Sequence, residues 1–257
     1  CGALRADWPR EFDRAAFERY LDARPAALMN RTAAVAAEAL PLQARAGQLW
    51  AAGALRRDDA RFARDAAAAL ERLGPTFIKI GQLLSVREDV VGPVWAAELA
   101  RLQATVSVGS PDAVDAIWAA DFVHLKRVDA TAAACASVAQ VHRGTWQGRD
   151  GEVTEVACKV LRPGVRDAVA VDLCVLLRAG EALETWAPRV LGQSNVDWRL
   201  LLGGLASALW SELDFEGEGE RQEKFRRNMH AVEHVTVPRV LGATRDVLVS
   251  EWVDGRA

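Results

Sequence analysis

The stretch that decides the fold runs from residue 132 to residue 161 and reads AAACASVAQVHRGTWQGRDGEVTEVACKVL. Residues 137–146 and 153–161 alternate apolar and polar side chains and are rich in β-branched residues, which is typical of β-strands. The Gly-Arg-Asp-Gly sequence at 148–151 predicts a turn that joins these two strands. Residues 122–128 have the same character, so the sequence predicts an antiparallel meander of three strands.

Two further strands are predicted nearer the C-terminus. Residues 235–241 and 246–253 carry the strand pattern, and a turn near Gly242 separates them. Between the two groups of strands, residues 163–191 and 196–229 have the composition of two long helices. The predicted order is therefore three strands, a helical stretch and two strands.

The residues that precede the meander predict a helical domain. They are rich in Ala, Leu, Arg and Glu and have almost no β-branched runs. Breaks are expected at Pro25, at Pro41 and at 53–58. Asp58 or Asp59 would cap a helix that ends at Leu73. Pro75 suits the first turn of the next helix, and Gly92 and Pro93 mark the boundary of a further short helix.

These patterns predict an α+β fold with two domains, a helical extension over residues 1–110 and a mixed domain over residues 111–257. The net charge of −3 gives no basic field for nucleic acid. No apolar run approaches the length of about 18 residues that spans a membrane. The four cysteines are Cys1, Cys135, Cys158 and Cys174, and none of them forms a CxxC pair. Neither a structural zinc site nor a disulfide framework is therefore expected.

Val156-Ala157-Cys158-Lys159 is the strongest local motif. In a kinase lobe the third strand carries a VAxK lysine that meets nucleotide phosphates. The ordinary alternative is an edge-strand lysine that faces water. Only four of the 32 basic residues are lysine, and a lysine retained in so Arg-rich a chain favours a role that needs a compact ammonium group.

The segment between the first two predicted strands, residues 132–140, holds Ala and Ser and no glycine. A protein kinase has a glycine-rich loop here, whose backbone amides approach the phosphates. Small side chains still permit a close approach, although the backbone is stiffer than a glycine loop. On composition alone, such a stretch is more often a packed helix turn or strand edge.

The runs ACASVAQVHRG and VACKVLRPGV resemble the UbiB (aarF-domain) family, protein-kinase-like proteins of coenzyme Q biosynthesis whose glycine-rich loop is replaced by an Ala-rich one. LGPTFIKIGQLLSVREDVV resembles the family's KxGQ motif, SELDFEGEGE its ExD motif, and VLVSEWVDG its hinge strand. The four motifs stand in the family's order over roughly residues 70–255. Residues 10–70 resemble the cyanobacterial and plastid branch more weakly.

The resemblance implies roles for single residues. Lys159 is similar to the β3 lysine, and Glu218 to the glutamate of the αC-type helix that pairs with it. Lys79, within a regulatory motif that also includes Gly81 and Gln82, would pair with Glu212. Asp214 would lie near the metal and the phosphates. The nucleotide would be covered by Ala133, Ala134, Cys135, Ala136 and Ser137. Its adenine edge would be bound by backbone groups of Glu251, Trp252 and Val253.

Residues 211–224 form an acidic stretch that is expected to be helical. On one continuous helix, Glu212 and Glu218 would lie about 120° apart and could address two different lysines. A solvated acidic face is the ordinary interpretation of residues 211–224. Gly217 and Gly219 oppose it, because each glycine costs about 1 kcal/mol in an exposed helix. A close approach of the helix backbone to a partner would explain both.

The resemblance also implies a protein-kinase-like N-lobe with a five-stranded antiparallel sheet, a fragment that ends at the hinge without the C-lobe, and ATP or ADP with Mg²⁺ as cofactors. The catalytic loop and the DFG segment cannot be found in the 257 residues, so we expect this fragment not to turn over ATP.

Two functions compete for the full-length protein. One is an atypical kinase or ATPase linked to prenylquinone or isoprenoid lipid metabolism, and the other is a nucleotide-gated pseudokinase scaffold for lipids or biosynthetic partners. A helical interaction module with an unrelated β-domain is a third alternative. The resemblance implies peripheral membrane contact in a plastid or a mitochondrion.

Overall fold

The computed structural model describes residues 8–53, 59–104, 110, 112–191 and 198–255. They belong to two compact units, one made of residues 1–105 with 167–209 and the other of residues 106–166 with 210–257. Residues 167–209 belong to the first unit, although they lie within the expected domain 111–257 that contains the sheet.

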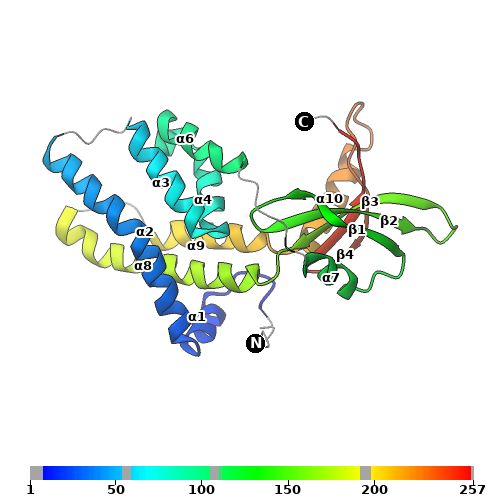
Figure 1. The fold of residues 1–257 in the computed structure, drawn as a ribbon, viewed down its shortest axis with the longest axis horizontal. Coiled ribbons are helices and arrows are strands. Elements are labelled where there is room, and N and C mark those ends of the chain that lie inside the picture. The colour runs from blue at the N-terminus through cyan, green and yellow to red at the C-terminus, as the bar shows by residue number, and fades with distance from the viewer. Residues whose placement is uncertain (1–7, 54–58, 105–109, 111, 192–197, 256–257) are drawn as a thin grey trace. The chain divides into compact units, whose positions relative to one another are not determined.

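The second unit is built on a five-stranded antiparallel sheet in the order β1-β2-β3-β5-β4 (Figure 1). The strands are β1 (Leu125–Cys135), β2 (Ala139–Gln147), β3 (Val153–Leu161), β4 (Val240–Ala243) and β5 (Val247–Glu251). This confirms the predicted five-stranded sheet, and β3 has the predicted bounds. β1 begins later than expected and runs to Cys135, and β4 covers only the end of its predicted segment.

One helix covers each face of the sheet. Alternate residues of a strand point to opposite faces, so Cys158 and Lys159 of β3 lie on different faces. The first face packs on α7 (Asp112–Ala119), which the sequence analysis did not predict, in a core that includes Ala113, Ile117, Val156, Cys158, Val160 and Val249. The second face, which carries Lys159 and Leu248, packs on α10 (Phe215–Met229).

The single helix expected over 196–229 is wrong. Trp198–Ser211 forms α9 and Phe215–Met229 forms α10, while Val196 and Asp197 lie outside the described residues. Asp214 stands at the N-cap of α10 with an extended backbone (φ −110°). Because Glu212 precedes this break, Glu212 and Glu218 do not share a helix, and the angular argument that placed them about 120° apart does not apply.

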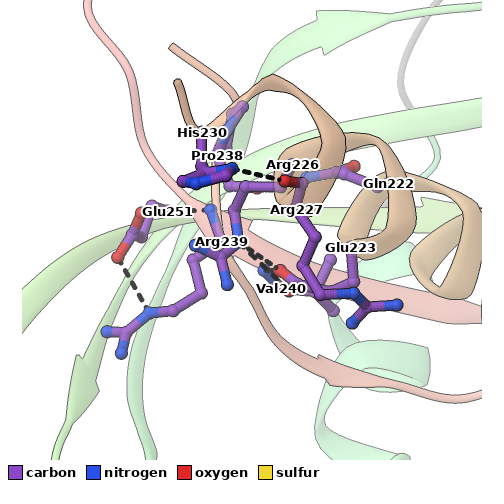
Figure 2. Close-up of polar contacts among 9 residues, drawn as sticks. All are labelled: Gln222, Glu223, Arg226, Arg227, His230, Pro238, Arg239, Val240 and Glu251. Carbon is purple, nitrogen blue, oxygen red and sulfur yellow. Dashed lines mark hydrogen bonds and ion pairs between the residues drawn. The ribbon is translucent and has the colours of Figure 1, made fainter. Parts of the chain in front are cut away.

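The C-terminal half of α10 is tied to the segment that enters β4 (Figure 2). Gln222 Nε2 donates to Pro238 O at 2.9 Å, and a carboxylate oxygen of Glu223 accepts from Val240 N at 2.8 Å. These contacts hold α10 along the sheet beyond the stretch that carries Glu218.

The first unit is helical. It contains α1 (Arg14–Asp22), α2 (Pro25–Ala51), α3 (Ala60–Leu73), α4 (Pro75–Ser85), α5 (Glu88–Val91), α6 (Pro93–Ala100), the short 3₁₀ helix η1 (Arg101–Ala104), and most of α8 (Val165–Leu191) and α9. Asp59 caps α3 by accepting from Phe62 N, and α4 and α6 begin at Pro75 and Pro93, as the sequence predicts. Pro41 does not break α2, which continues through it. The predicted break at 53–58 lies, apart from Gly53, outside the described residues.

A buried carboxylate links three helices of this unit. Asp172 of α8, 1% exposed, accepts from the guanidinium of Arg31 on α2 and from the hydroxyl of Thr76 on α4. Arg31 also donates to Leu73 O at the end of α3. Burial raises the pKa of Asp172 above its ordinary value, against the opposing effects of Arg31 and Thr76. The group is held in place by this network, because a buried charge without partners is costly.

Candidate functional site

Lys159 and Glu218 form an ion pair between β3 and α10. Lys159 Nζ lies 2.5 Å and 2.7 Å from the two carboxylate oxygens of Glu218, so both oxygens accept from one ammonium group. The same nitrogen lies 4.4 Å from the ring centroid of Phe215, which is fully buried. Both side chains of the pair remain 32% exposed, so the ammonium group is oriented by the protein and still accessible to a ligand.

The two glycines of α10 explain how this helix comes so close to the sheet. A Cβ atom on Gly219 would lie 3.1 Å from Leu248 Cδ1 and 3.3 Å from Ala243 Cβ. A larger residue would therefore push α10 away from β4 and β5. The side of α10 that carries Gly217 and Gly219 is buried, whereas Glu216 and Glu220 are exposed. The buried side agrees with the argument drawn from the glycines in the sequence.

Asp214 lies one turn before Glu218, and its backbone oxygen accepts from Glu218 N at 3.0 Å. The residue is 8% exposed, and its side chain makes no capping hydrogen bond to α10. Mg²⁺ is usually held by one or two carboxylates together with phosphate oxygens and water. A single carboxylate on the pair's own helix fits that pattern. Among the described residues no group of three or more His, Cys, Asp and Glu side chains is arranged to hold a metal ion.

The Ala-rich segment is mostly strand. Ala133, Ala134 and Cys135 belong to β1, whereas Ala136 and Ser137 lie in the turn that leads to β2. The expectation of a loop over 132–140 is therefore wrong at both ends, because residues 132–135 pair with 140–142 and residues 139–140 belong to β2. We call residues 136–138 the Ala-rich turn. One hydrogen bond closes it, from Ala136 N to Ala139 O at 2.8 Å.

The hinge residues follow β5. Glu251 N donates to Arg239 O and Trp252 N to Glu155 O, and the Glu251 carboxylate accepts from the backbone and side chain of Arg239 (Figure 2). In the part of the chain that the structure describes, Val253 N has no hydrogen-bond acceptor. Of the three predicted hinge residues, only Val253 therefore offers an N–H group to a ligand.

The face of the sheet that carries Lys159 also holds residues that sequence reasoning missed. Val141 is the cross-strand neighbour of Lys159, and Ala157 lies two residues before it on the same face. Next to them the Arg143 guanidinium lies 4.8 Å from the ring centroid of Trp252 and pairs with Glu155. The alternation of residues 139–161 with period two could have assigned these side chains to the lysine face.

The KxGQ residues are in α4 of the first unit. Gln82 Nε2 donates to Leu102 O at 3.0 Å, and a Cβ atom on Gly81 would lie 2.3 Å from Leu102 Cδ1. Both residues therefore pack α4 on η1. Lys79 belongs to the first unit and Glu212 to the second, so the pairing of these two side chains stays a prediction.

No helix in the described parts of the chain combines the length and hydropathy needed to cross a membrane.

Comparison with known proteins finds relatives that are similar to this chain in sequence. A chloroplastic protein of Arabidopsis thaliana, Activity of bc1 complex kinase 8, is 35% identical over 191 residues, which cover 72% of this chain and 24% of the relative. An uncharacterised aarF domain-containing protein kinase of the same plant, also chloroplastic, is 31% identical over 79% of this chain and 30% of the relative. An uncharacterised Synechocystis protein is 31% identical over 78% of this chain and 34% of its own length. This chain thus spans about a quarter to a third of these relatives.

A solved structure of a Mycobacterium tuberculosis protein in complex with erythromycin matches with 29% identity and a TM-score of 0.44, over 51% of this chain and 31% of that one. The ABC1 atypical kinase-like domain family matches residues 118–257, which include all of β1 to β5 and α10. This match, together with the α+β fold and its five-stranded antiparallel sheet, shows that the chain belongs to the ABC1 (aarF) atypical kinase-like family.

Proposed function

We propose that the protein containing this chain binds ATP or ADP, with Mg²⁺, on the face of the sheet that carries Lys159. The single observation behind the proposal is the contact of Lys159 Nζ with both carboxylate oxygens of Glu218, at 2.5 Å and 2.7 Å. A kinase-like site uses such a pair to hold the lysine toward the α- and β-phosphates. The metal would screen the phosphate charge, and Asp214 is the residue of this chain that would hold it.

The remaining contacts suit a nucleotide. Val141 and Ala157 present apolar surface against which a planar base can pack, and the N–H group of Val253 can donate to the edge of that base. Ala133, Ala134, Cys135, Ala136 and Ser137 would cover the phosphates, with small side chains that allow a close backbone approach.

For the whole protein we favour an atypical kinase or ATPase that acts in prenylquinone or isoprenoid lipid metabolism. The family membership and the paired lysine support this choice. We also propose that the 257-residue chain does not hydrolyse ATP by itself, because no catalytic loop or DFG segment is found in its sequence. The names of the Arabidopsis relatives favour a plastid over a mitochondrion, and contact with lipid at a membrane surface is part of the proposal.

The test is nucleotide binding by the intact protein. A fluorescent ATP analogue is titrated against the wild type, Lys159→Met and Lys126→Met. Lys126 is the matched control, because it is an exposed lysine of β1 whose Nζ contacts only Val123 O in the described structure. We expect Lys159→Met to weaken binding at least about tenfold and Lys126→Met to leave it unchanged. Equal affinities for all three proteins would refute the proposal.

Phosphate release at saturating ATP separates the two forms of the proposal. Turnover by the intact protein that Lys159→Met abolishes supports the kinase or ATPase. Binding with no turnover and no phosphorylated product supports a nucleotide-gated pseudokinase scaffold.

A further inference from the structure

The residues that directly follow β3 connect two parts of the proposed site. β3 ends at Leu161, two residues after Lys159, and α8 begins at Val165. Between them the chain reverses at Pro163 and Gly164, where Gly164 has a φ of +73° that favours glycine. Arg162 and Arg166 flank this reversal, and both direct side-chain donors at backbone carbonyl groups.

Arg162 holds the Ala-rich turn. Its backbone N donates to Val138 O at 2.9 Å, and its side-chain Nε donates to Ala136 O at 3.0 Å. The turn itself has only the hydrogen bond from Ala136 N to Ala139 O. A single residue at the end of β3 thus holds two of the three carbonyl groups of the turn. The side-chain bond can be removed by mutation while the backbone bond stays.

Arg166 holds the segment that leads to Asp214. Its Nη2 donates to Leu213 O at 2.7 Å and to Arg245 O at 3.3 Å, and its Nη1 pairs with Asp246 Oδ1 at 2.6 Å. The side chain is only 17% exposed, so little water competes for these bonds. Leu213 directly precedes Asp214 in the chain, so these bonds fix the backbone from which the Asp214 carboxylate extends.

The planar fork of arginine is needed for the second set of contacts. One guanidinium group reaches three acceptors on two segments, which a lysine ammonium on a flexible stem cannot do with the same geometry. Arg245 O also accepts from Phe215 N at 3.3 Å. Arg166 therefore acts directly on the residue before Asp214 and, through Arg245, on the residue after it.

We propose that Arg162 and Arg166 are positioning residues that hold the Ala-rich turn and the Asp214 segment in place relative to Lys159. This inference rests on the proposed nucleotide site. The two arginines act on different parts of that site: Arg162 sets the backbone that covers the phosphates, and Arg166 sets the carboxylate that meets the metal.

The test uses the intact protein with Arg162→Ala, Arg162→Lys, Arg166→Ala and Arg166→Lys. Arg149→Ala is the matched control, because Arg149 is exposed in the turn between β2 and β3. Affinity for a fluorescent ATP analogue is measured once with Mg²⁺ and once with EDTA. Hydrogen–deuterium exchange of peptides covering 133–139 and 211–216 is followed by mass spectrometry without nucleotide.

We expect Arg162→Ala to weaken binding about tenfold in both conditions and to speed exchange in 133–139. Arg166→Ala should reduce chiefly the gain in affinity that Mg²⁺ provides, and should speed exchange in 211–216. Arg166→Lys should resemble Arg166→Ala, and Arg149→Ala should match the wild type. If an alanine variant fails to fold, the lysine variants carry the same comparison.

Two results would overturn the proposal. One is wild-type exchange in both peptides for every arginine variant. The other is Arg166→Lys with the full Mg²⁺ effect, which would show that charge suffices without the fork. If the intact wild-type protein binds no nucleotide, that result counts against the proposed function instead. The exchange experiment alone then decides whether the two arginines hold these segments.

Discussion

A Cβ atom on Gly217 would lie 2.7 Å from Oδ2 of Asp214 and 3.1 Å from Nη1 of Arg221. The glycine therefore makes room for the carboxylate that the proposed site assigns to the metal. A contact of 2.7 Å is shorter than real Cβ atoms allow, so any other residue at 217 forces Asp214 to turn. Helix α10 keeps a residue of poor helix propensity at a point where Ala would be favoured by about 1 kcal/mol.

Gly217→Ala should separate stability from metal binding. We expect the melting temperature to stay the same or to rise slightly, because alanine is the better helix former and only the end of a side chain must move. The Mg²⁺-dependent part of nucleotide affinity should fall about tenfold. Differential scanning fluorimetry and nucleotide titrations with Mg²⁺ and with EDTA measure the two effects. A variant with the full Mg²⁺ effect would contradict the role given to Asp214.

Val253→Pro should weaken nucleotide binding without a large change in stability. Proline removes the N–H group that has no acceptor among the described residues, and Val253 is 49% exposed. Loss of one hydrogen bond to the base predicts a fall of about fivefold to tenfold in affinity. Val253→Ala keeps the N–H group and is the control. Equal affinities of the two variants, measured by calorimetric titration, would exclude the backbone contact.

Arg31→Ala should destabilise the helical unit by about 3 kcal/mol, because it leaves the buried carboxylate of Asp172 without its charged partner. Burial already raises the pKa of Asp172, so the folded protein takes up a proton here more readily than the unfolded chain. A folded pKa above the unfolded value means that stability is gained as the pH falls through the raised pKa and lost as the pH rises.

The defect of Arg31→Ala should therefore shrink as the pH is lowered from 7 toward the range in which Asp172 binds a proton. Urea unfolding at a series of pH values measures this, with Arg72→Ala as the control, since Arg72 pairs with Glu38 at the exposed surface. A defect that is the same at every pH would contradict the buried-charge explanation.

The cysteines should differ in their reaction with iodoacetamide. Burial raises the pKa of Cys158 to about 12 and that of Cys174 to about 11, and both thiols lie in the core. Cys135 is half-buried at the end of β1, beside the Ala-rich turn. At pH 8 we expect Cys135 to be alkylated and Cys158 and Cys174 to stay unmodified, because the thiolate is the reactive form.

Bound nucleotide should protect Cys135 if the Ala-rich turn covers the phosphates. Peptide mass spectrometry distinguishes each cysteine, and Cys158 and Cys174 serve as internal references. Alkylation of Cys135 at the same rate with and without nucleotide would place the ligand elsewhere.

The sequence predicted β3 with its observed bounds because its alternation is regular and both flanks carry turn residues. It placed the loop after β1 too early, since the small alanines of 132–135 carry no side-chain signal that separates a strand from a loop. The helix α7 was missed because residues 112–119 are too few for a strong period.

The residues needed for the site could be identified from the sequence, because the VACK strand, the Ala-rich segment and the acidic helix each have local patterns and stand in the family's order. The contacts between these residues could not be identified from the sequence. That Glu218 reaches Lys159 and that Arg166 holds Leu213 was decided only by the tertiary packing of this unit. These contacts join residues 59 and 47 positions apart in the sequence, and local propensity carries no information about contacts of that range.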